Sequence, residues 1–100
     1  MPIFLPKEPS RRELLLTAVL YALSDDIRLG IVRQLAAKGE QACGVFELNK
    51  PKSSLSHHFR VLREAGVVST RKEGKTLLNT LRKGDLDARF PGLMKAVLKG

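Results

Sequence analysis

The sequence has a single cysteine, Cys43, and few acidic residues, with 10 Asp and Glu against 18 Lys and Arg. One thiol cannot close a disulfide within the chain or form a thiolate cage by itself, so a disulfide-stabilised secreted domain is excluded. No apolar run approaches the roughly 20 residues that span a bilayer, and prolines interrupt the apolar start of the chain. We therefore expect a cytoplasmic protein without a membrane partner.

Groups that could carry out catalysis are also scarce. The sequence has no glycine-rich phosphate-binding loop, and the adjacent His57 and His58 with the distant Cys43 form no set of nucleophile, base and orienting group. We predict that the chain is not an enzyme and needs no cofactor. Cys43 is expected to be a small buried apolar residue, and redox sensing is the alternative role for its thiol.

The length and balance of the chain predict one compact domain. It has 100 residues, of which 43% are hydrophobic and 28% are charged, as is typical of globular proteins. Prolines at positions 2, 6 and 9 favour an extended N-terminal arm over residues 1–9. A single domain over residues 10–99 would follow.

The first helix is predicted from about Arg11 to Leu23, because Ser10 followed by Glu13 forms a capping-box pattern. Its apolar residues lie at nearly every angle around the axis, so one layer of neighbours would cover only one side. We expect a second copy of the chain to cover the other side; one broad apolar face is the alternative. The residues expected at this contact are Leu15, Leu16, Val19 and Leu20.

The next segment predicts an ordinary core helix. Residues 24–26 supply a cap and two carboxylates at its start, and apolar residues recur at helical spacing until Lys38-Gly39 ends it. A short apolar stretch over residues 42–48 is interpreted as a short helix. Pro51 fits the first turn of the helix that follows.

Residues 51–65 predict a helix with two different faces. Leu55, Phe59 and Leu62 recur at i, i+4 and i+7 and would pack on the core. His58, adjacent to Phe59, is expected at the edge of the core with a satisfied hydrogen bond. The outward or flanking faces would carry Lys52, Ser53, Ser56, His57, Arg60 and Arg63.

The C-terminal third predicts a hairpin and a last helix. β-rich segments at residues 67–70 and 76–81 flank a charged turn in which Gly74 permits a positive φ, so a two-stranded hairpin over about 67–82 is expected. Pro91-Gly92 prevents one straight helix from crossing the tail, which places the last helix from Pro91 onward. The predicted fold class is mainly α with a small β-hairpin, in the element order of a winged helix-turn-helix.

The positive charge is concentrated in part of this fold. Residues 50–83 hold nine basic against two acidic side chains, a net charge of +7 out of the +8 of the whole chain. They form the predicted recognition helix, about 51–65, and the wing. A helix fits the major groove of B-DNA and a hairpin can reach the neighbouring backbone. We therefore predict binding to double-stranded DNA.

The residue types assign different contacts to different positions. Polar groups in the first turn of the recognition helix, where the helix dipole favours a phosphate, would position the domain: Lys52, Ser53 and Ser54. Residues one turn further on would contact base edges: Ser56, His57 and Arg60. Basic residues of the wing would contact phosphates: Arg71, Lys72 and Lys75. For His57, a neutral exposed side chain without a base contact is the alternative.

Segments Ala22–Leu29, Ser53–Val68 and Arg71–Lys75 together resemble the ArsR/SmtB family of dimeric bacterial winged-helix repressors. The Ser-His-His run that ends in Leu-Arg-Glu-Ala-Gly is the most specific part. The resemblance implies a homodimer joined through the first and last helices, binding to an operator, and release when a ligand or oxidant, here an unidentified effector, is sensed. The implied contact residues of the last helix are Leu93, Met94 and Val97.

The metal sites of that family do not match this sequence. Metal-sensing members resemble one another in a cysteine pair near the short helix, or in histidine and carboxylate ligands on a long last helix. Here residues 40–44 contain one thiol and the last helix has no histidine. We predict no metal site.

Two other functions fit the same fold. Winged helices also serve as protein-interaction modules, and the apolar first helix could engage a different protein. A basic face could also bind RNA, or any DNA without regard to sequence.

Overall fold

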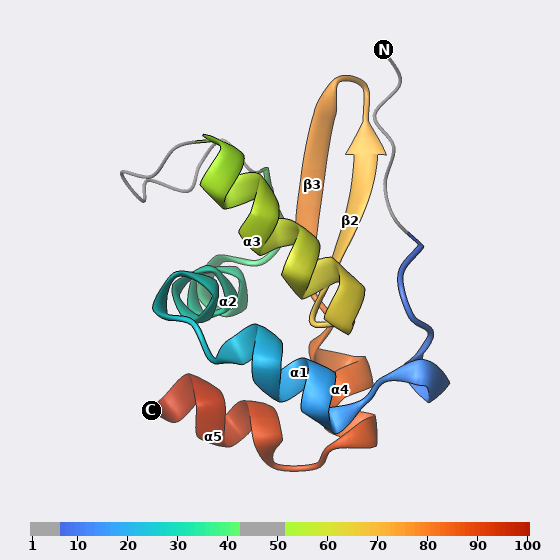
Figure 1. Cartoon of the computed structure of the whole chain (residues 1–100), viewed down its shortest axis with the longest axis vertical. Helices are drawn as coiled ribbons and strands as arrows, with labels where there is room; N and C mark the ends of the chain where they lie inside the picture. The colour runs from blue at the N-terminus through green and yellow to red at the C-terminus, as the bar shows by residue number, and fades with distance from the viewer. Residues whose placement is uncertain (1–6, 43–51) are drawn as a thin grey trace.

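The structure is a computed structural model that describes residues 7–42 and 52–100 of the chain. Figure 1 shows the helices and strands within these ranges. Their bounds are η1, a single 3-10 turn, Arg11–Glu13; α1 Leu16–Leu23; α2 Asp26–Lys38; β1 Gln41–Ala42; α3 Lys52–Ala65; β2 Val68–Glu73; β3 Thr76–Leu81; α4 Lys83–Arg89; and α5 Leu93–Lys99.

The elements are arranged so that α3 lies across the β2–β3 hairpin (Figure 1). The start of α3 and the tip of the hairpin lie at one end of the molecule, while α1, α4 and α5 lie at the other end. The mainly α fold with a small hairpin, as predicted, is confirmed.

The sheet has three antiparallel strands in the order β1-β3-β2. Val68 pairs with Leu81 at the base of the hairpin and Glu73 pairs with Thr76 at its tip. Gly74 adopts a φ of 61° in the turn, as its position in a tight hairpin requires. The third strand, β1, was not predicted, because two residues are too few to show a periodic pattern. The short helix expected over residues 42–48 lies outside the described residues except for Ala42, which belongs to β1.

The first helix begins later than predicted. Glu13 does accept a hydrogen bond from the Ser10 N–H, at 2.8 Å, but this opens only the 3-10 turn η1. Leu14 and Leu15 are extended, with ψ of 127° and 128°. The break turns Leu14 into the core, where it is fully buried, and leaves Leu15 exposed. The apolar residues that the sequence placed all around one helix are therefore divided by an interruption of that helix at Leu14 and Leu15.

The second helix forms as predicted. The Asp25 carboxylate accepts hydrogen bonds from the N–H groups of Ile27, at 2.9 Å, and Arg28, at 3.0 Å. Gly39 ends α2 at a φ of 81°. The pattern of cap, apolar repeat and glycine therefore predicted both ends of α2 correctly.

The core contains side chains from α1, α2, α3, the hairpin, α4 and α5. Its largest fully buried residues include Leu14, Val19, Ile31, Val32, Phe59, Leu62, Val67, Val68, Leu86 and Met94. Val19 and Met94 were predicted to contact a second copy, and this placement is corrected: both are covered completely by their own chain. Val19 lies on the face of α1 that packs on the core, whereas Leu16 and Leu20 lie on its exposed face.

The tail forms two helices where the sequence predicted one. Residues 83–89 form α4, which buries Leu86 and has ion pairs on its surface, including Lys83 Nζ to Asp87 Oδ2 at 2.8 Å. Gly92, at a φ of 87°, then precedes α5, which begins at Leu93. None of the helices in residues 7–42 and 52–100 has the length and apolar character needed to cross a membrane.

Candidate nucleic-acid interface

The outward face of α3 carries the side chains predicted to contact base edges. Ser56, His57 and Arg60 are all exposed, whereas Phe59 and Leu62 are buried on the opposite side. Residues four apart lie one above another on a helix, so Ser56 and Arg60 share a line along this face. The structure therefore brings together the three predicted reading residues on one exposed surface.

The start of α3 holds the residues predicted to contact phosphate. Lys52 and Ser53 lie in the first turn of the helix, and Ser54 is half-buried.

Arg63 does not lie on the outward face. Its residue is 9% exposed, so the prediction of an outward or flanking side chain is corrected. Arg63 follows Phe59 by four residues and shares its packed side of the helix. The exposed charge of the last two turns of α3 is therefore Arg60 and Glu64.

The wing presents two exposed lysines near its tip. Lys72 lies in β2, two residues after the buried Thr70 and on the same face of the strand, and Lys75 lies in the turn beside Gly74. Figure 1 shows this tip at the same end of the molecule as the start of α3.

Arg71 is held by carboxylates. Its Nη2 and Nε donate to Glu40 at 2.8 and 3.1 Å, and its Nη1 lies 2.8 Å from Glu73 Oε2. The hydrogen bonds from Arg71 hold the pKa of Glu40 below its ordinary value. A phosphate contact by Arg71, as the sequence predicted, would have to compete with both carboxylates.

The N-terminal arm contacts the wing, which the sequence did not reveal. The Glu8 carboxylate accepts hydrogen bonds from Ser69 Oγ, at 2.7 Å, and from the Thr70 N–H, at 2.8 Å. Arg82 Nη1 also donates to the Pro9 carbonyl at 2.6 Å. Glu8 therefore covers part of the outer edge of β2, and residues 1–6 of the predicted arm lie outside the described residues.

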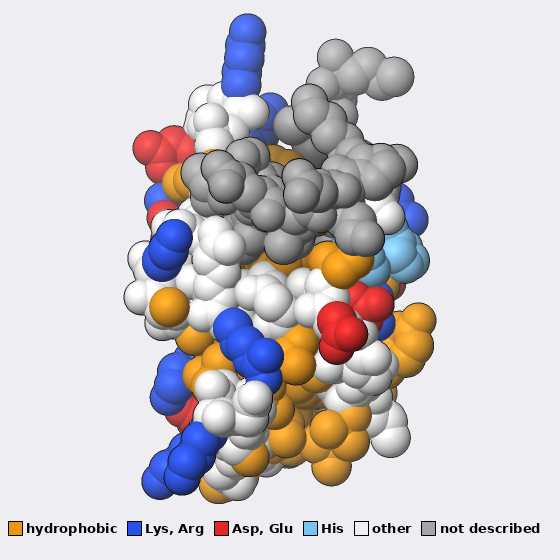
Figure 2. Space-filling view, turned by 90° about the vertical axis from the view of Figure 1, so that its left-hand side faces the viewer, with side chains coloured by type: hydrophobic (Ala, Val, Ile, Leu, Met, Phe, Trp, Pro, Cys, Tyr) orange, Lys and Arg blue, Asp and Glu red, His pale blue; other side chains and the backbone are white. Residues whose placement is uncertain are grey.

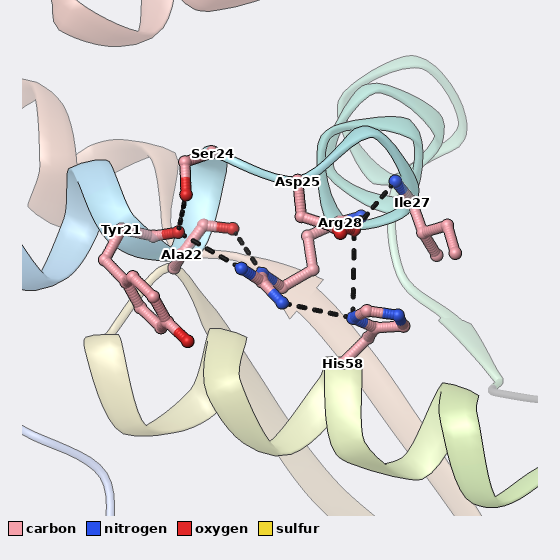
Figure 3. Close-up of polar contacts among 7 residues, drawn as sticks. All are labelled: Tyr21, Ala22, Ser24, Asp25, Ile27, Arg28 and His58. Atoms are coloured by element: carbon pink, nitrogen blue, oxygen red, sulfur yellow. Dashed lines mark hydrogen bonds and ion pairs between the residues drawn. The ribbon is translucent and has the colours of Figure 1, made fainter.

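His58 lies at the edge of the core, as predicted. It is 8% exposed, and its Nδ1 is 3.2 Å from Arg28 Nη1 (Figure 3). His57, next to it, is exposed. The two adjacent histidines thus have different environments, one facing outward and one inside the helical body.

Exposed apolar side chains gather on α1 and before it. Leu15, Leu16, Leu20 and Tyr21 are 63%, 45%, 46% and 62% exposed. Leu93 and Val97 of α5 are half-buried. In the face shown in Figure 2, hydrophobic side chains concentrate toward the end of the molecule opposite the hairpin tip. This apolar surface lies at the opposite end of the molecule from the wing tip, so each of the two surfaces could contact a different partner at the same time.

The described residues contain no cluster that could hold a metal ion, meaning three or more His, Cys, Asp or Glu side chains. Cys43, the residue predicted as a core thiol or redox sensor, lies outside the described residues.

A recognition helix with an exposed polar face, packed on a basic hairpin, defines a winged helix-turn-helix protein. The protein-family model described as "Bacterial regulatory protein, arsR family" matches residues 25–70 of this chain. The uncharacterized HTH-type transcriptional regulator YceK of Bacillus subtilis is 37% identical, over 79% of this chain and 82% of that protein. The chain belongs to the arsR family and is a DNA-binding regulator of transcription.

Two further proteins are similar to this chain, one in sequence and one in both sequence and structure. The arsenical resistance operon repressor of Escherichia coli K12 is 40% identical, over 53% of this chain and 47% of that protein. The structure of HlyU from Vibrio cholerae matches with a TM-score of 0.65 and 32% identity, covering 80% of this chain and 88% of that one. The resemblance found in the sequence is therefore confirmed, along with the regulatory class of the protein.

Proposed function

We propose that this protein is a homodimeric repressor that binds a specific DNA operator and leaves it when an unidentified effector is sensed. The observation that carries the proposal is the common exposed surface of Ser56, His57 and Arg60 on α3. These residue types form hydrogen bonds with base edges, and an arginine can contact guanine in two places. They lie beside a wing whose lysines can bind phosphate.

The wing and the start of α3 would supply affinity without reading sequence. Lys72 and Lys75 are exposed near the tip, and Lys52, Ser53 and Ser54 lie in the first turn of α3. Contacts to phosphate release counterions, so this part of the binding should weaken as salt rises.

A second copy of the chain would bind to the exposed apolar surface of α1. Leu15, Leu16 and Leu20 form this surface with Tyr21, which the sequence did not indicate, and Leu93 and Val97 lie on α5. A two-fold dimer would place its recognition helices in successive major grooves, about 10 base pairs apart. The expected operator is therefore pseudo-palindromic.

Release by an effector requires two dimer geometries with different affinities for the effector. One geometry would match the spacing of successive grooves, and the other would not. The similar protein of Escherichia coli is named as an operon repressor, which supports repression as the outcome.

The proposal is tested by competition between DNA sequences. The full chain is used to select duplexes of about 30 base pairs from a randomised pool, and its affinity for the selected duplex is compared with that for a random duplex at one salt concentration. We expect preference of at least about a thousandfold for a pseudo-palindromic sequence. Equal affinity for all duplexes would identify a non-specific binder, and no DNA binding would favour a protein-interaction module.

A further inference from the structure

Arg28 is buried, although arginine is almost never fully buried unless its charge is paired or hydrogen-bonded. The residue is 5% exposed and lies in the first turn of α2. Its Nε donates to the Ala22 carbonyl at 2.7 Å and its Nη2 to the Tyr21 carbonyl at 3.2 Å (Figure 3). These carbonyls belong to the last turn of α1, where the Tyr21 carbonyl also accepts from the Ser24 N–H at 3.1 Å and from Ser24 Oγ at 2.6 Å. Arg28, at the start of α2, therefore forms hydrogen bonds with the end of α1.

The third contact of Arg28 reaches the recognition helix. Its Nη1 lies 3.2 Å from Nδ1 of His58, which is buried on α3. A guanidinium group has donors and no acceptor. A hydrogen bond across this contact requires that Nδ1 accept it and carry no proton. One side chain thus connects α1, which holds the proposed dimer contact, with α3, which holds the proposed base contacts.

The surroundings of His58 offer a different partner to a protonated ring. Asp25 Oδ2 lies 3.8 Å from Nδ1. Backbone hydrogen bonds, first of all from the Arg28 N–H, hold the pKa of Asp25 below its ordinary value, so this group is a carboxylate at neutral pH. The titratable side chains nearby also include Tyr21, whose ring lies 5.3 Å from the Arg28 Cζ, and His57, whose ring centre is 5.6 Å from that of His58. A proton on Nδ1 would remove the acceptor for Arg28, place two cations side by side and favour contact with Asp25.

We propose that Arg28 is a positioning residue for DNA binding, which holds α3 against α1 through the unprotonated Nδ1 of His58. In a dimer joined through α1, this contact sets the direction in which each α3 projects, and hence the match to two successive grooves. The assignment rests on the proposed function, because it needs an operator that both recognition helices contact at once.

Three variants separate the contact from the fold. His58→Asn keeps an acceptor close to the position of Nδ1 but cannot be protonated. His58→Leu removes the acceptor and keeps an apolar side chain of similar bulk. Arg28→Lys keeps the charge but replaces the planar fork with a single donor group that cannot reach α1 and His58 together in the same way.

The measurement uses the duplex that the wild-type chain selects from a randomised pool at about pH 7.5. The dissociation constants for this duplex and for a random duplex are followed by fluorescence anisotropy from about pH 8 to about pH 5.5 at constant ionic strength. Circular dichroism and sedimentation at each pH report whether the variants are folded and in the same oligomeric state. His57→Asn is the matched control, because it removes the other histidine of the pair.

We expect His58→Leu and Arg28→Lys to bind the selected duplex about tenfold more weakly than the wild type at pH 7.5, with less effect on the random duplex. The affinity of the wild type for the selected duplex should fall by about tenfold toward the acidic end relative to His58→Asn. His57→Asn should keep that acidic loss whatever its affinity at pH 7.5. Combining Arg28→Lys with His58→Leu should cost less than the sum of the single changes.

The outcomes separate this assignment from the proposed function. If the wild type selects a duplex and the folded His58→Leu and Arg28→Lys proteins bind it as the wild type does, the positioning role is wrong and the proposed function stands. Should His58→Leu fail to fold, identical pH profiles for His58→Asn and the wild type would equally overturn the role. A wild-type chain that selects no duplex at any pH would overturn the proposed function, and the positioning role with it.

Discussion

Arg71 and Glu40 are 31 residues apart in sequence and form a two-point contact, Nη2 to Oε1 at 2.8 Å and Nε to Oε2 at 3.1 Å. Glu40 directly follows Gly39, the C-cap of α2. Thr80 Oγ1 of β3 donates to the same carboxylate at 2.9 Å. One carboxylate at the end of α2 thus contacts both strands of the wing, in addition to the pairing of β1 with β3.

Removing that charge should matter only where Glu40 is ionised. Its pKa is held below the ordinary value of 4.5 chiefly by the hydrogen bonds from Arg71. A lowered pKa in the folded state stabilises the protein above the ordinary value, and this stability is lost as the pH falls through the lower, folded value. We expect Glu40→Gln to lower the melting temperature only slightly at pH 7, because the pair is exposed to solvent, and this difference should shrink as the pH falls below 4.5 and the carboxylate becomes protonated.

Thermal unfolding of Glu40→Gln and the wild type at several pH values measures this difference. Glu64→Gln, which removes an exposed carboxylate from α3, serves as the control for the loss of one negative charge. A difference between Glu40→Gln and the wild type that stayed constant from pH 7 down to pH 2 would contradict the stated cause.

Arg60 and Lys72 should affect DNA binding in different ways. We expect Arg60→Ala to weaken binding to the selected duplex by about 1 to 3 kcal/mol and to relax the preference at one base pair. Lys72→Ala should weaken binding to all duplexes alike and reduce the slope of log affinity against log salt by about one unit. Titrations of both variants with selected and random duplexes at several salt concentrations give both quantities. The same behaviour for both variants would show that α3 does not read sequence through Arg60.

A charge on the exposed surface of α1 should separate the two copies of the proposed dimer. Leu20 is 46% exposed, and burial of an unpaired carboxylate in its place would oppose dimer formation. We expect Leu20→Glu to weaken self-association by about 2 kcal/mol or more and to reduce operator affinity with it. Sedimentation at several protein concentrations measures the effect. Ala36→Glu, a change at an exposed position of α2, should leave the association unchanged; a stable Leu20→Glu dimer would place the contact elsewhere.

Gly66 should tolerate no side chain. It ends α3 at a φ of 82°, and an added methyl group would collide with the buried Leu14 and with Pro9. Strain and collision together should make Gly66→Ala destabilising by about 2 kcal/mol or more. Chemical unfolding of this variant can be compared with Gly30→Ala, where α2 offers open space and the change should stabilise by about 0.5 to 1 kcal/mol. Similar stabilities for the two variants would contradict the packing of Leu14 against Gly66.

Local patterns in the sequence determined several parts of this protein. The Asp25 cap and Gly39 define α2, and Gly74 allows the turn of the wing. The helical repeat of α3 separates Phe59 and Leu62 from the exposed Ser56, His57 and Arg60. Each of these features depends on residues a few positions apart, because helical and strand periodicity and the φ of glycine are local properties.

Contacts between distant residues were decided only by the tertiary structure. Leu14 lies in the extended segment between η1 and α1, and its side chain packs beside Gly66, 52 positions away. Arg28 reaches His58, and Glu8 reaches Thr70, across 30 and 62 positions. Such pairs form when separate elements pack side by side, and no periodicity of either segment encodes its partner. The exposed face of α3 with Ser56, His57 and Arg60 was therefore evident from the sequence, whereas the burial of Arg63 and the pairing of Arg71 with Glu40 required the folded chain.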